Sequence, residues 1–374
     1  MTLFSRAITS TIHRTHHYLP PPPLLCAFRK IMTGIPSQKT GIGIHQTGDF
    51  DVLDKVTVPL KVDAGEIVVK GEYFGINFID TYYRKGLYAL KEFPAIIGTE
   101  LSGTIVALPM DAAVLEDPEY KKRGYTVGAK VAVGGGGSFA LHSDYASVAW
   151  KAVHVLPAGI STRIAASSLL QGLTALTFVE EAHKVQKGET ILVHTVAGGL
   201  GLLFAQLIKA RGATVIGTTS TKEKAELAKA NGADHVILYK EEDTVQRVLE
   251  LTNGVGVDAV FDGVGKDTFD NNFKLLKRKG TLVSVGNASG AVPPFAPIRL
   301  VEKNLKLLRP TVGNYAHTPA ELQHYTKWLF SLIEDGTLKI KIHKEYEFSR
   351  DGAIQAQKDL IGGKTTGKLL IKVE

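Results

Sequence analysis

The chain has 374 residues, of which 44% are hydrophobic, enough for cores in two or three domains. Its one cysteine, Cys26, excludes a disulfide framework, and no apolar run approaches the roughly 20 residues of a membrane span. The formal net charge is +7, but residues 1–48 carry five basic residues and no acid, and removing those five from +7 leaves +2. That remainder is too small to argue for nucleic-acid binding.

The first 36 residues are typical of a targeting segment. They lack acids, are rich in Ser and Thr, and place Phe4, Ile8 and Ile12 on one helical face with Arg6 opposite. Four consecutive prolines at residues 20–23 prevent further helix. We expect mitochondrial import, with a disordered extension, or a cytoplasmic product translated from Met32, as the alternatives.

Residues 37–160 alternate short apolar runs with Gly, Pro and Asp, which predicts an irregular β-rich domain. The first strands are expected over residues 41–46, 60–62 and 66–73. Two denser motifs follow, GINFIDTYYRKGLY and FPAIIGTELSGTIV, and then a charged, irregular insertion over residues 110–125. A connection and a helix are expected over residues 157–181.

Residues 187–224 have the pattern of a dinucleotide-binding unit. Strand, glycine turn, helix and strand are expected in that order over residues 190–194, 197–201, 202–210 and 214–217. Glycines let backbone N–H groups approach a pyrophosphate at the positive end of the helix. Val196 replaces the first glycine of G-x-G-x-x-G, so only Gly198 and Gly201 match, and an ordinary tight turn is the alternative.

The end of the second strand indicates which dinucleotide binds. An NAD site would place Asp or Glu about 20 residues past the turn to hold the ribose 2′-hydroxyl. This chain instead has hydroxyl residues followed by lysines, namely Thr218, Thr219, Ser220, Thr221, Lys222 and Lys224. Such groups suit a 2′-phosphate, which a carboxylate would repel, so the sequence favours NADPH.

Strand and helix patterns keep alternating beyond this unit, which predicts a doubly wound parallel sheet. Helices are expected over residues 222–231, 243–252 and 268–277, and strands over residues 236–238, 257–262 and 281–285. Ligands bind such sheets at the carboxyl ends of strands, so residues 262–265 and 286–287 are candidates for the nicotinamide end. A Pro-rich loop, a long helix and two strands are expected over residues 291–309, 319–335, 338–343 and 367–373.

Seven motifs occur in a family-specific order: GINFIDTYYRKGLY, IIGTELSGTI, QGLTAL, VAGGLG, DGVGKDTF, SVGNASG and GKLLIKV. Over about residues 41–374 the chain resembles the zinc-independent quinone oxidoreductases, the ζ-crystallin branch of the medium-chain dehydrogenases/reductases. The resemblance implies an α/β fold, with a GroES-like β-rich catalytic domain and a Rossmann domain built on a doubly wound parallel sheet. It also implies NADPH-dependent reduction of quinones, usually by a homodimer.

On this resemblance the chain divides into four parts. They are a targeting or disordered segment (1–36), the first part of the catalytic domain (37–160), the Rossmann NADPH-binding domain (161–309) and the C-terminal part of the catalytic domain (310–374).

The resemblance also assigns site residues by position. Those expected to contact NADPH are Gly198, Gly199, Gly201, Ser220, Lys224, Tyr239, Val264, Asn287 and Lys364. Those expected to line the substrate cleft and hydrogen-bond the acceptor are Asn77, Tyr82 and Tyr88. The family often has Ser where this chain has Gly263, and Arg near Gly363, where Lys364 is the neighbouring cation.

No metal site is expected. Zinc-dependent relatives bind the catalytic ion through a Cys and a His where this chain has Asn77 and Thr99. Without a Lewis acid the acceptor must itself be electrophilic, as a quinone or a conjugated enone is. An NADPH-dependent 2-alkenal or enone reductase is therefore the nearest alternative. RNA binding, which the ζ-crystallin resemblance raises, is an alternative of another class, but residues 49–374 have no basic run with interleaved aromatics.

Overall fold

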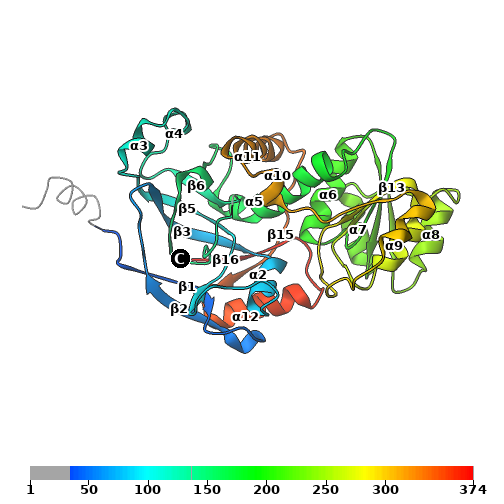
Figure 1. The fold of residues 1–374 in the computed structure, drawn as a ribbon, viewed down its shortest axis with the longest axis horizontal. Helices are drawn as coiled ribbons and strands as arrows, with labels where there is room; N and C mark the ends of the chain where they lie inside the picture. Colours follow the sequence, from blue (N-terminus) through cyan, green and yellow to red (C-terminus); the bar gives the residue numbers. More distant parts are fainter. Residues whose placement is uncertain (1–33, 136, 374) are drawn as a thin grey trace, which may run out of the picture. The chain divides into compact units, whose positions relative to one another are not determined.

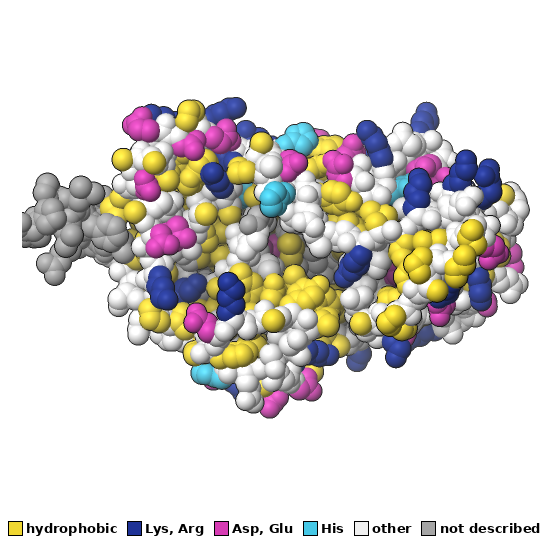
Figure 2. All heavy atoms as spheres, viewed as in Figure 1, with side chains coloured by type: hydrophobic (Ala, Val, Ile, Leu, Met, Phe, Trp, Pro, Cys, Tyr) yellow, Lys and Arg dark blue, Asp and Glu magenta, His cyan; other side chains and the backbone are white. Residues whose placement is uncertain are grey.

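The computed structural model describes residues 34–135 and 137–373, and the predicted targeting segment lies almost entirely outside them. Residues 36–374 form one unit. Within the described residues no helix is long and apolar enough to cross a membrane. On the face shown in Figure 2, lysine and arginine side chains are scattered among acidic ones.

A six-stranded parallel sheet, ordered β11-β10-β9-β12-β13-β14, forms one part of this unit (Figure 1). Its strands are β9 (Thr190–Val193), β10 (Thr214–Thr219), β11 (His235–Leu238), β12 (Val257–Asp262), β13 (Leu276–Ser284) and β14 (Lys306–Leu308). Its connecting helices are α6 (Gly199–Ala210), α7 (Lys222–Ala230), α8 (Thr244–Leu251) and α9 (Phe269–Leu275). The strand order reverses between β9 and β12, where sheets of this kind bind ligands. The predicted doubly wound sheet is confirmed.

The other part is β-rich. A seven-stranded sheet has the order β15-β16-β3-β5-β6-β8 with β7 on β3, and a three-stranded sheet has the order β2-β1-β4. The strands are β1 (Gln38–Ile44), β2 (Leu53–Pro59), β3 (Glu66–Ile76), β4 (Ala95–Ile96), β5 (Glu100–Ala107), β6 (Lys130–Gly134), β7 (Tyr145–Ala149), β8 (Val153–Val155), β15 (Ile342–Glu347) and β16 (Lys368–Lys372). The last strand, β16, pairs antiparallel with β3, so the C-terminal segment completes a sheet begun near the start of the chain.

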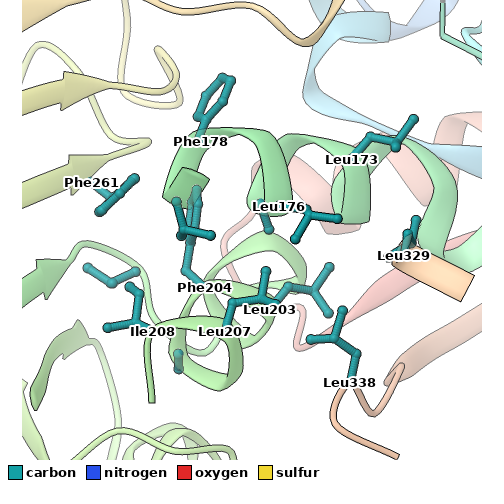
Figure 3. Packing of buried hydrophobic residues seen from close by; sticks show 14 of the residues in the cluster. Leu173, Leu176, Phe178, Leu203, Phe204, Leu207, Ile208, Phe261, Leu329 and Leu338 are labelled. Atoms are coloured by element: carbon teal, nitrogen blue, oxygen red, sulfur yellow. The ribbon is translucent and has the colours of Figure 1, made fainter. Parts of the chain in front are cut away.

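Helix α5 (Thr162–Thr177) packs against both parts. It begins at Ser161, whose Oγ accepts the Ile164 N–H at 3.3 Å. One stretch of the helix contacts strands β3, β5 and β6, and its apolar end packs on α6. Figure 3 shows this core, formed by Leu173, Leu176, Phe178, Leu203, Phe204, Leu207, Ile208, Phe261, Leu329 and Leu338. Burying a side chain of this size is worth about 1.5–3 kcal/mol, so this cluster fixes α5 relative to α6.

Several expected elements differ from the structure. Residues 60–62 are not a strand. The strand is β2, which ends just before them at Pro59. It is an edge strand with β1 as its partner, so its charged side chains are tolerated. The insertion is not irregular but forms α3 (Ala112–Glu116) and α4 (Pro118–Arg123), begun by the capping side chains of Asp111 and Asp117. The strand expected over residues 338–343 is β15, four residues later.

Two helices also depart from the prediction. Helix α12 (Arg350–Ile361) was missed because its sequence is mostly polar; the Ser349 Oγ begins it by accepting the Gly352 N–H at 3.0 Å. Helix α6 begins at Gly199, three residues earlier than expected, so the last glycines of the turn lie in its first turn. The long C-terminal helix is α11 (Pro319–Glu334), as predicted.

Gly201 is required by the close approach of α6 to the end of β9. A Cβ atom on Gly201 would lie 2.4 Å from the Thr195 carbonyl oxygen and 2.7 Å from the Val196 backbone. Around Gly263, by contrast, nothing lies within 4 Å of an added Cβ. Gly201 cannot gain a methyl group unless the helix moves, whereas Gly263 has room for one.

We expect Gly201→Ala to lower the free energy of unfolding by about 1–3 kcal/mol, because the added methyl group must displace backbone atoms. Gly263→Ala is the matched control and should change it by less than about 1 kcal/mol, because it also restricts the unfolded chain. Denaturant-induced unfolding measures both. Similar losses in the two variants would contradict the packing argument.

Candidate active site

The turn between β9 and α6 exposes backbone N–H groups at a helix N-terminus. Gly198 is the N-cap with extended backbone, and the first N–H groups of α6 have no partner within the helix. Val196, in place of the first fingerprint glycine, is buried, and its N–H donates to the Thr218 carbonyl at 3.0 Å. Val196 therefore anchors the turn to β10. A Cβ on Gly199 would lie 2.6 Å from Gln171 Oε1, whereas one on Gly198 would meet only the Thr195 carbonyl oxygen, at 3.2 Å. This cradle fits a pyrophosphate.

Ser220 and Tyr239 lie at neighbouring strand ends. Ser220 directly follows β10 and Tyr239 directly follows β11, and the Tyr239 N–H donates to the Thr219 carbonyl at 3.1 Å. The Tyr239 side chain is 48% exposed, so its ring is free to stack on a ligand. These two predicted residues are brought together at the edge where a nucleotide ribose would lie.

Lys224 faces a loop of the C-terminal segment. Its Nζ donates to the Gly363 carbonyl at 2.6 Å, next to the exposed Lys364. Burial, and then the charge of Lys240, lower the pKa of Lys224. A phosphate dianion among these cations would offset their repulsion, so the residues present fit a 2′-phosphate. Lys364 stays the cation expected near the position of the family's arginine.

Asp262 organises the loops at the predicted nicotinamide end. Its Oδ1 accepts the N–H groups of Val264 at 2.8 Å and Gly265 at 3.2 Å. Its carbonyl accepts the N–H of Val285 at 2.7 Å, which ties the loop after β12 to the loop after β13. Val264 and Asn287, both expected at this end, therefore lie on two loops that are bonded to each other.

A buried chain of hydrogen bonds supports these loops from below. His194, directly after β9, has Nδ1 3.0 Å from Thr218 Oγ1 and Nε2 2.9 Å from Asn272 Oδ1. Asn272 Nδ2 donates to Asp262 Oδ2 at 2.7 Å, so its Oδ1 is an acceptor and His194 carries its proton on Nε2. Sequence reasoning missed His194 and Asn272. A polar residue at the end of an apolar strand is the signal that could have indicated His194.

Tyr82, expected in the substrate cleft, contacts Asn287, which is expected near the nicotinamide. It lies in α2 (Phe78–Arg84), and its hydroxyl oxygen accepts the Asn287 N–H at 3.1 Å. Its ring is edge-on to that of Tyr88, which in turn is edge-on to Tyr83, with centroids 5.6 and 5.5 Å apart. Burial raises the pKa of Tyr82, so the hydroxyl keeps its proton at neutral pH. The structure thus brings Tyr82, Tyr88 and Asn287 together.

Asn77 is the buried N-cap of α2. Its Nδ2 donates to the Gly75 carbonyl at 3.2 Å and to Glu100 Oε1 at 2.7 Å, and its Oδ1 accepts from Lys368 Nζ at 2.6 Å. Both amide hydrogens are therefore engaged by the protein, and the hydrogen bond from Asn77 to a substrate stays a prediction. Glu100 and Lys368 were missed by sequence reasoning, although a lysine that opens the apolar run of the last strand is unusual.

Two family models match the chain, one described as the alcohol dehydrogenase GroES-like domain over residues 63–158 and one as zinc-binding dehydrogenase over residues 199–331. Quinone oxidoreductase from Pseudomonas aeruginosa is 38% identical over 84% of this chain and 93% of its own length. The solved structure of Escherichia coli quinone oxidoreductase complexed with NADPH matches with a TM-score of 0.82 and 35% identity, covering 89% of this chain and 99% of that one. A 2-haloacrylate reductase from Burkholderia is 32% identical over 88% of this chain and 97% of its own.

The chain belongs to the quinone oxidoreductase family of the medium-chain dehydrogenases/reductases. The resemblance predicted from the seven motifs is confirmed, as is the α/β fold class with GroES-like and Rossmann domains. The ligand-binding residues of this family member stay predictions.

The zinc site implied by the description of the second model does not fit this quinone oxidoreductase. Asn77 and Thr99 stand where zinc-dependent relatives have ligands, and Thr99 Oγ1 is buried without a hydrogen-bond partner. In the described part of the chain, no group of three or more His, Cys, Asp or Glu side chains is placed to hold a metal ion. The only cysteine, Cys26, lies outside those residues.

Two buried titratable side chains lie beside Asn77 in this enzyme. Asp80 Oδ2 accepts the Asn77 N–H at 2.7 Å and lies 3.7 Å from His142 Nε2. Burial raises the pKa of Asp80 to about 7 and lowers that of His142 to about 3. His142 Nε2 is also 3.1 Å from the Gly75 carbonyl, so the neutral ring carries its proton there. Asp80 therefore titrates near neutrality while His142 stays uncharged.

We expect Asp80→Asn to change how stability depends on pH. The folded-state pKa of about 7 exceeds the ordinary 3.8. The stability that Asp80 contributes is therefore fully present below about pH 4 and is lost toward pH 7, by about 1.4 kcal/mol per pH unit. The asparagine keeps an acceptor for the Asn77 N–H and never ionises. The variant should therefore gain stability relative to the wild type between pH 5 and 7, measured by chemical denaturation.

His142 changes stability in the opposite sense, because its folded-state pKa is lowered, but it does so in both proteins and cancels from the difference. Asp351→Asn is the control, because that side chain is 94% exposed and should show no pH-dependent gain. A constant difference between Asp80→Asn and the wild type across this range would contradict the assignment.

Proposed function

We propose that this protein reduces quinones with NADPH and without a metal ion. The observation that carries the proposal is the hydrogen bond from the Asn287 N–H to the Tyr82 hydroxyl, at 3.1 Å. It places a neutral, proton-bearing hydroxyl beside the carboxyl ends of the parallel strands, where dinucleotides bind in folds of this kind. The relatives whose names describe quinone oxidoreductases, one of them solved with NADPH, support the same assignment.

The chain's own residues would bind and orient the cofactor, which when bound supplies a hydride. The first-turn N–H groups of α6 would hold the pyrophosphate at Gly198, Gly199 and Gly201. The adenosine phosphate would lie among Ser220, Lys224, Tyr239 and Lys364, and the loops carrying Val264 and Asn287 would contact the nicotinamide. Asp262 keeps those two loops in place through its bonds to Val264 and Val285.

Tyr82 would orient the acceptor. Its oxygen already accepts the Asn287 N–H, so its own proton points elsewhere and is available to an acceptor oxygen. The Tyr88 ring lies beside it, and the aromatic series continues from Tyr88 to Tyr83 and from Tyr83 to Phe139, whose centroids are 4.6 Å apart. Flat aromatic walls favour a flat, conjugated substrate. A second candidate substrate class, conjugated enals and enones, is supported by the relative named 2-haloacrylate reductase.

We also infer that the protein is imported into mitochondria and acts as a homodimer. The first inference rests on the acid-free N-terminal segment, which lies outside the described residues. The second is supported by strand β14, which among the described strands pairs only with β13 and follows a segment that exposes Ile298 and Val301. An open strand edge beside exposed apolar side chains favours contact with a second copy.

Lys224→Ala should raise the KM for NADPH by about tenfold to a hundredfold, because one charge-assisted contact to the 2′-phosphate is lost. The KM for NADH should hardly change, since NADH lacks that phosphate. Lys229→Ala is the matched control, because Lys229 lies at the other end of α7 and pairs with Glu226. Steady-state kinetics with both cofactors measure the effect, and equal losses for NADH and NADPH would contradict it.

A panel of acceptors assayed with NADPH after exhaustive chelation tests the reaction itself. Unhindered quinones should be reduced fastest, conjugated enals more slowly and saturated ketones hardly at all, because no Lewis acid polarises the acceptor.

Tyr82→Phe should lower kcat by about tenfold to a thousandfold, through loss of one hydrogen-bond donor, with the KM for NADPH nearly unchanged. Tyr88→Phe should have a smaller effect. Efficient reduction of a saturated ketone would refute the mechanism, and enals surpassing every quinone would favour the second substrate class.

A further inference from the structure

A cation contacts the loop to which the Tyr82 hydroxyl is bonded. Arg309 directly follows β14, and its Nη1 donates to the Ser284 carbonyl at 2.8 Å and to the Val285 carbonyl. Two residues further on, the Asn287 N–H donates to the Tyr82 hydroxyl at 3.1 Å. The guanidinium and the hydroxyl thus contact the same four-residue stretch, at the carboxyl end of β13. Burial raises the pKa of Tyr82, and the positive charge of Arg309 opposes that effect.

The guanidinium of Arg309 is only partly used by the protein. Arg309 is exposed, and Nη1 makes both of its carbonyl bonds, which leaves Nη2 and Nε of the planar fork for other acceptors. Arg299 pairs with Asp270 and Arg247 pairs with Glu250, whereas Arg309 forms no ion pair within residues 34–135 and 137–373. No described acid thus lies within ion-pair distance of its guanidinium.

Quinone reduction creates a negative charge that such a group can stabilise. Transfer of a hydride, two electrons with one proton, converts a quinone to the hydroquinone monoanion, and one further proton from water gives the neutral hydroquinone. A guanidinium stays protonated throughout and offers paired donors to an anionic oxygen. Fixed donors at the position where charge develops lower the barrier more than donors that must reorganise.

We propose that Arg309 is a catalytic residue that stabilises the anionic oxygen of the reduced acceptor, with the Tyr82 hydroxyl as the second donor. The proposal rests on the proposed quinone reduction and deepens it. The hydrogen bonds from Arg309 to the carbonyls of Ser284 and Val285 hold the guanidinium in place before the acceptor binds. The chain thereby supplies a fixed organic cation in a site whose residues do not fit a metal ion.

The test uses the full chain without cofactor and 4-nitrophenol, whose phenol and phenolate forms differ in absorbance. The wild type should bind the phenolate at least about tenfold more tightly than Arg309→Gln, because a charge-assisted contact is lost. Arg309→Lys, which keeps the charge but not the fork, should lie between them. Arg278→Gln is the matched control, because Arg278 is exposed at the other end of β13. NADPH affinity, measured by fluorescence, should stay within about twofold in all variants.

Equal phenolate affinity in the wild type and Arg309→Gln, or no phenolate binding by the wild type, would overturn the proposal. A quinone should displace the bound phenolate, and failure to do so would also overturn it, because the anion would then lie elsewhere. If Arg309→Gln does not fold, the comparison of Arg309→Lys with the wild type decides. Failure of the proposed function is a separate result, namely a wild type that reduces no quinone with NADPH, because the binding assay needs no turnover.

Discussion

The ion pair between Lys368 and Glu100 is the contact on which the position of helix α2 and of Tyr82 depends. Both side chains are 1% exposed, and they join the last strand of the chain to β5. Removing one partner of such a pair leaves an uncompensated buried charge and typically costs about 3–5 kcal/mol. Here the pair also accepts from and donates to Asn77, so the start of α2 is held by the same contacts.

Because Asn77 fixes the start of α2, it also fixes the position of Tyr82 on that helix. Asn77 caps the helix that carries Tyr82. Gly75, two residues earlier, lies so close to the ion pair that a Cβ there would be 2.3 Å from Glu100 Oε1. Residue 75 must therefore be glycine for the carboxylate of Glu100 and the ammonium of Lys368 to fit. In this way residues from β3, β5 and β16 together determine where the Tyr82 hydroxyl lies.

In the Rossmann domain a second series of contacts holds the loop whose Asn287 N–H bonds to the Tyr82 hydroxyl. His194, Asn272 and Asp262 form a hydrogen-bonded series below the strand ends, and Asp262 also bonds to the loops above them. Because these groups are buried and bonded to one another, the loops keep a single arrangement before ligand arrives. The Tyr82 hydroxyl and the Asn287 N–H meet where the two chains of contacts end. Arg309 lies against the same loop and places a positive charge there.

The sequence alone determined the fold class, the parallel sheet and the glycine turn. These features depend on local patterns, namely the period of apolar residues and glycine spacing. It misplaced β15 and missed α12 because their polar sequences carry a weak periodic signal and their boundaries are set by caps and strand partners. Only the tertiary structure brought Lys368 to Asn77, 291 residues away, and Tyr82 to Asn287, 205 residues away. No local pattern encodes such pairs, because each polar group acquires its partner only when distant strands pack and exclude water.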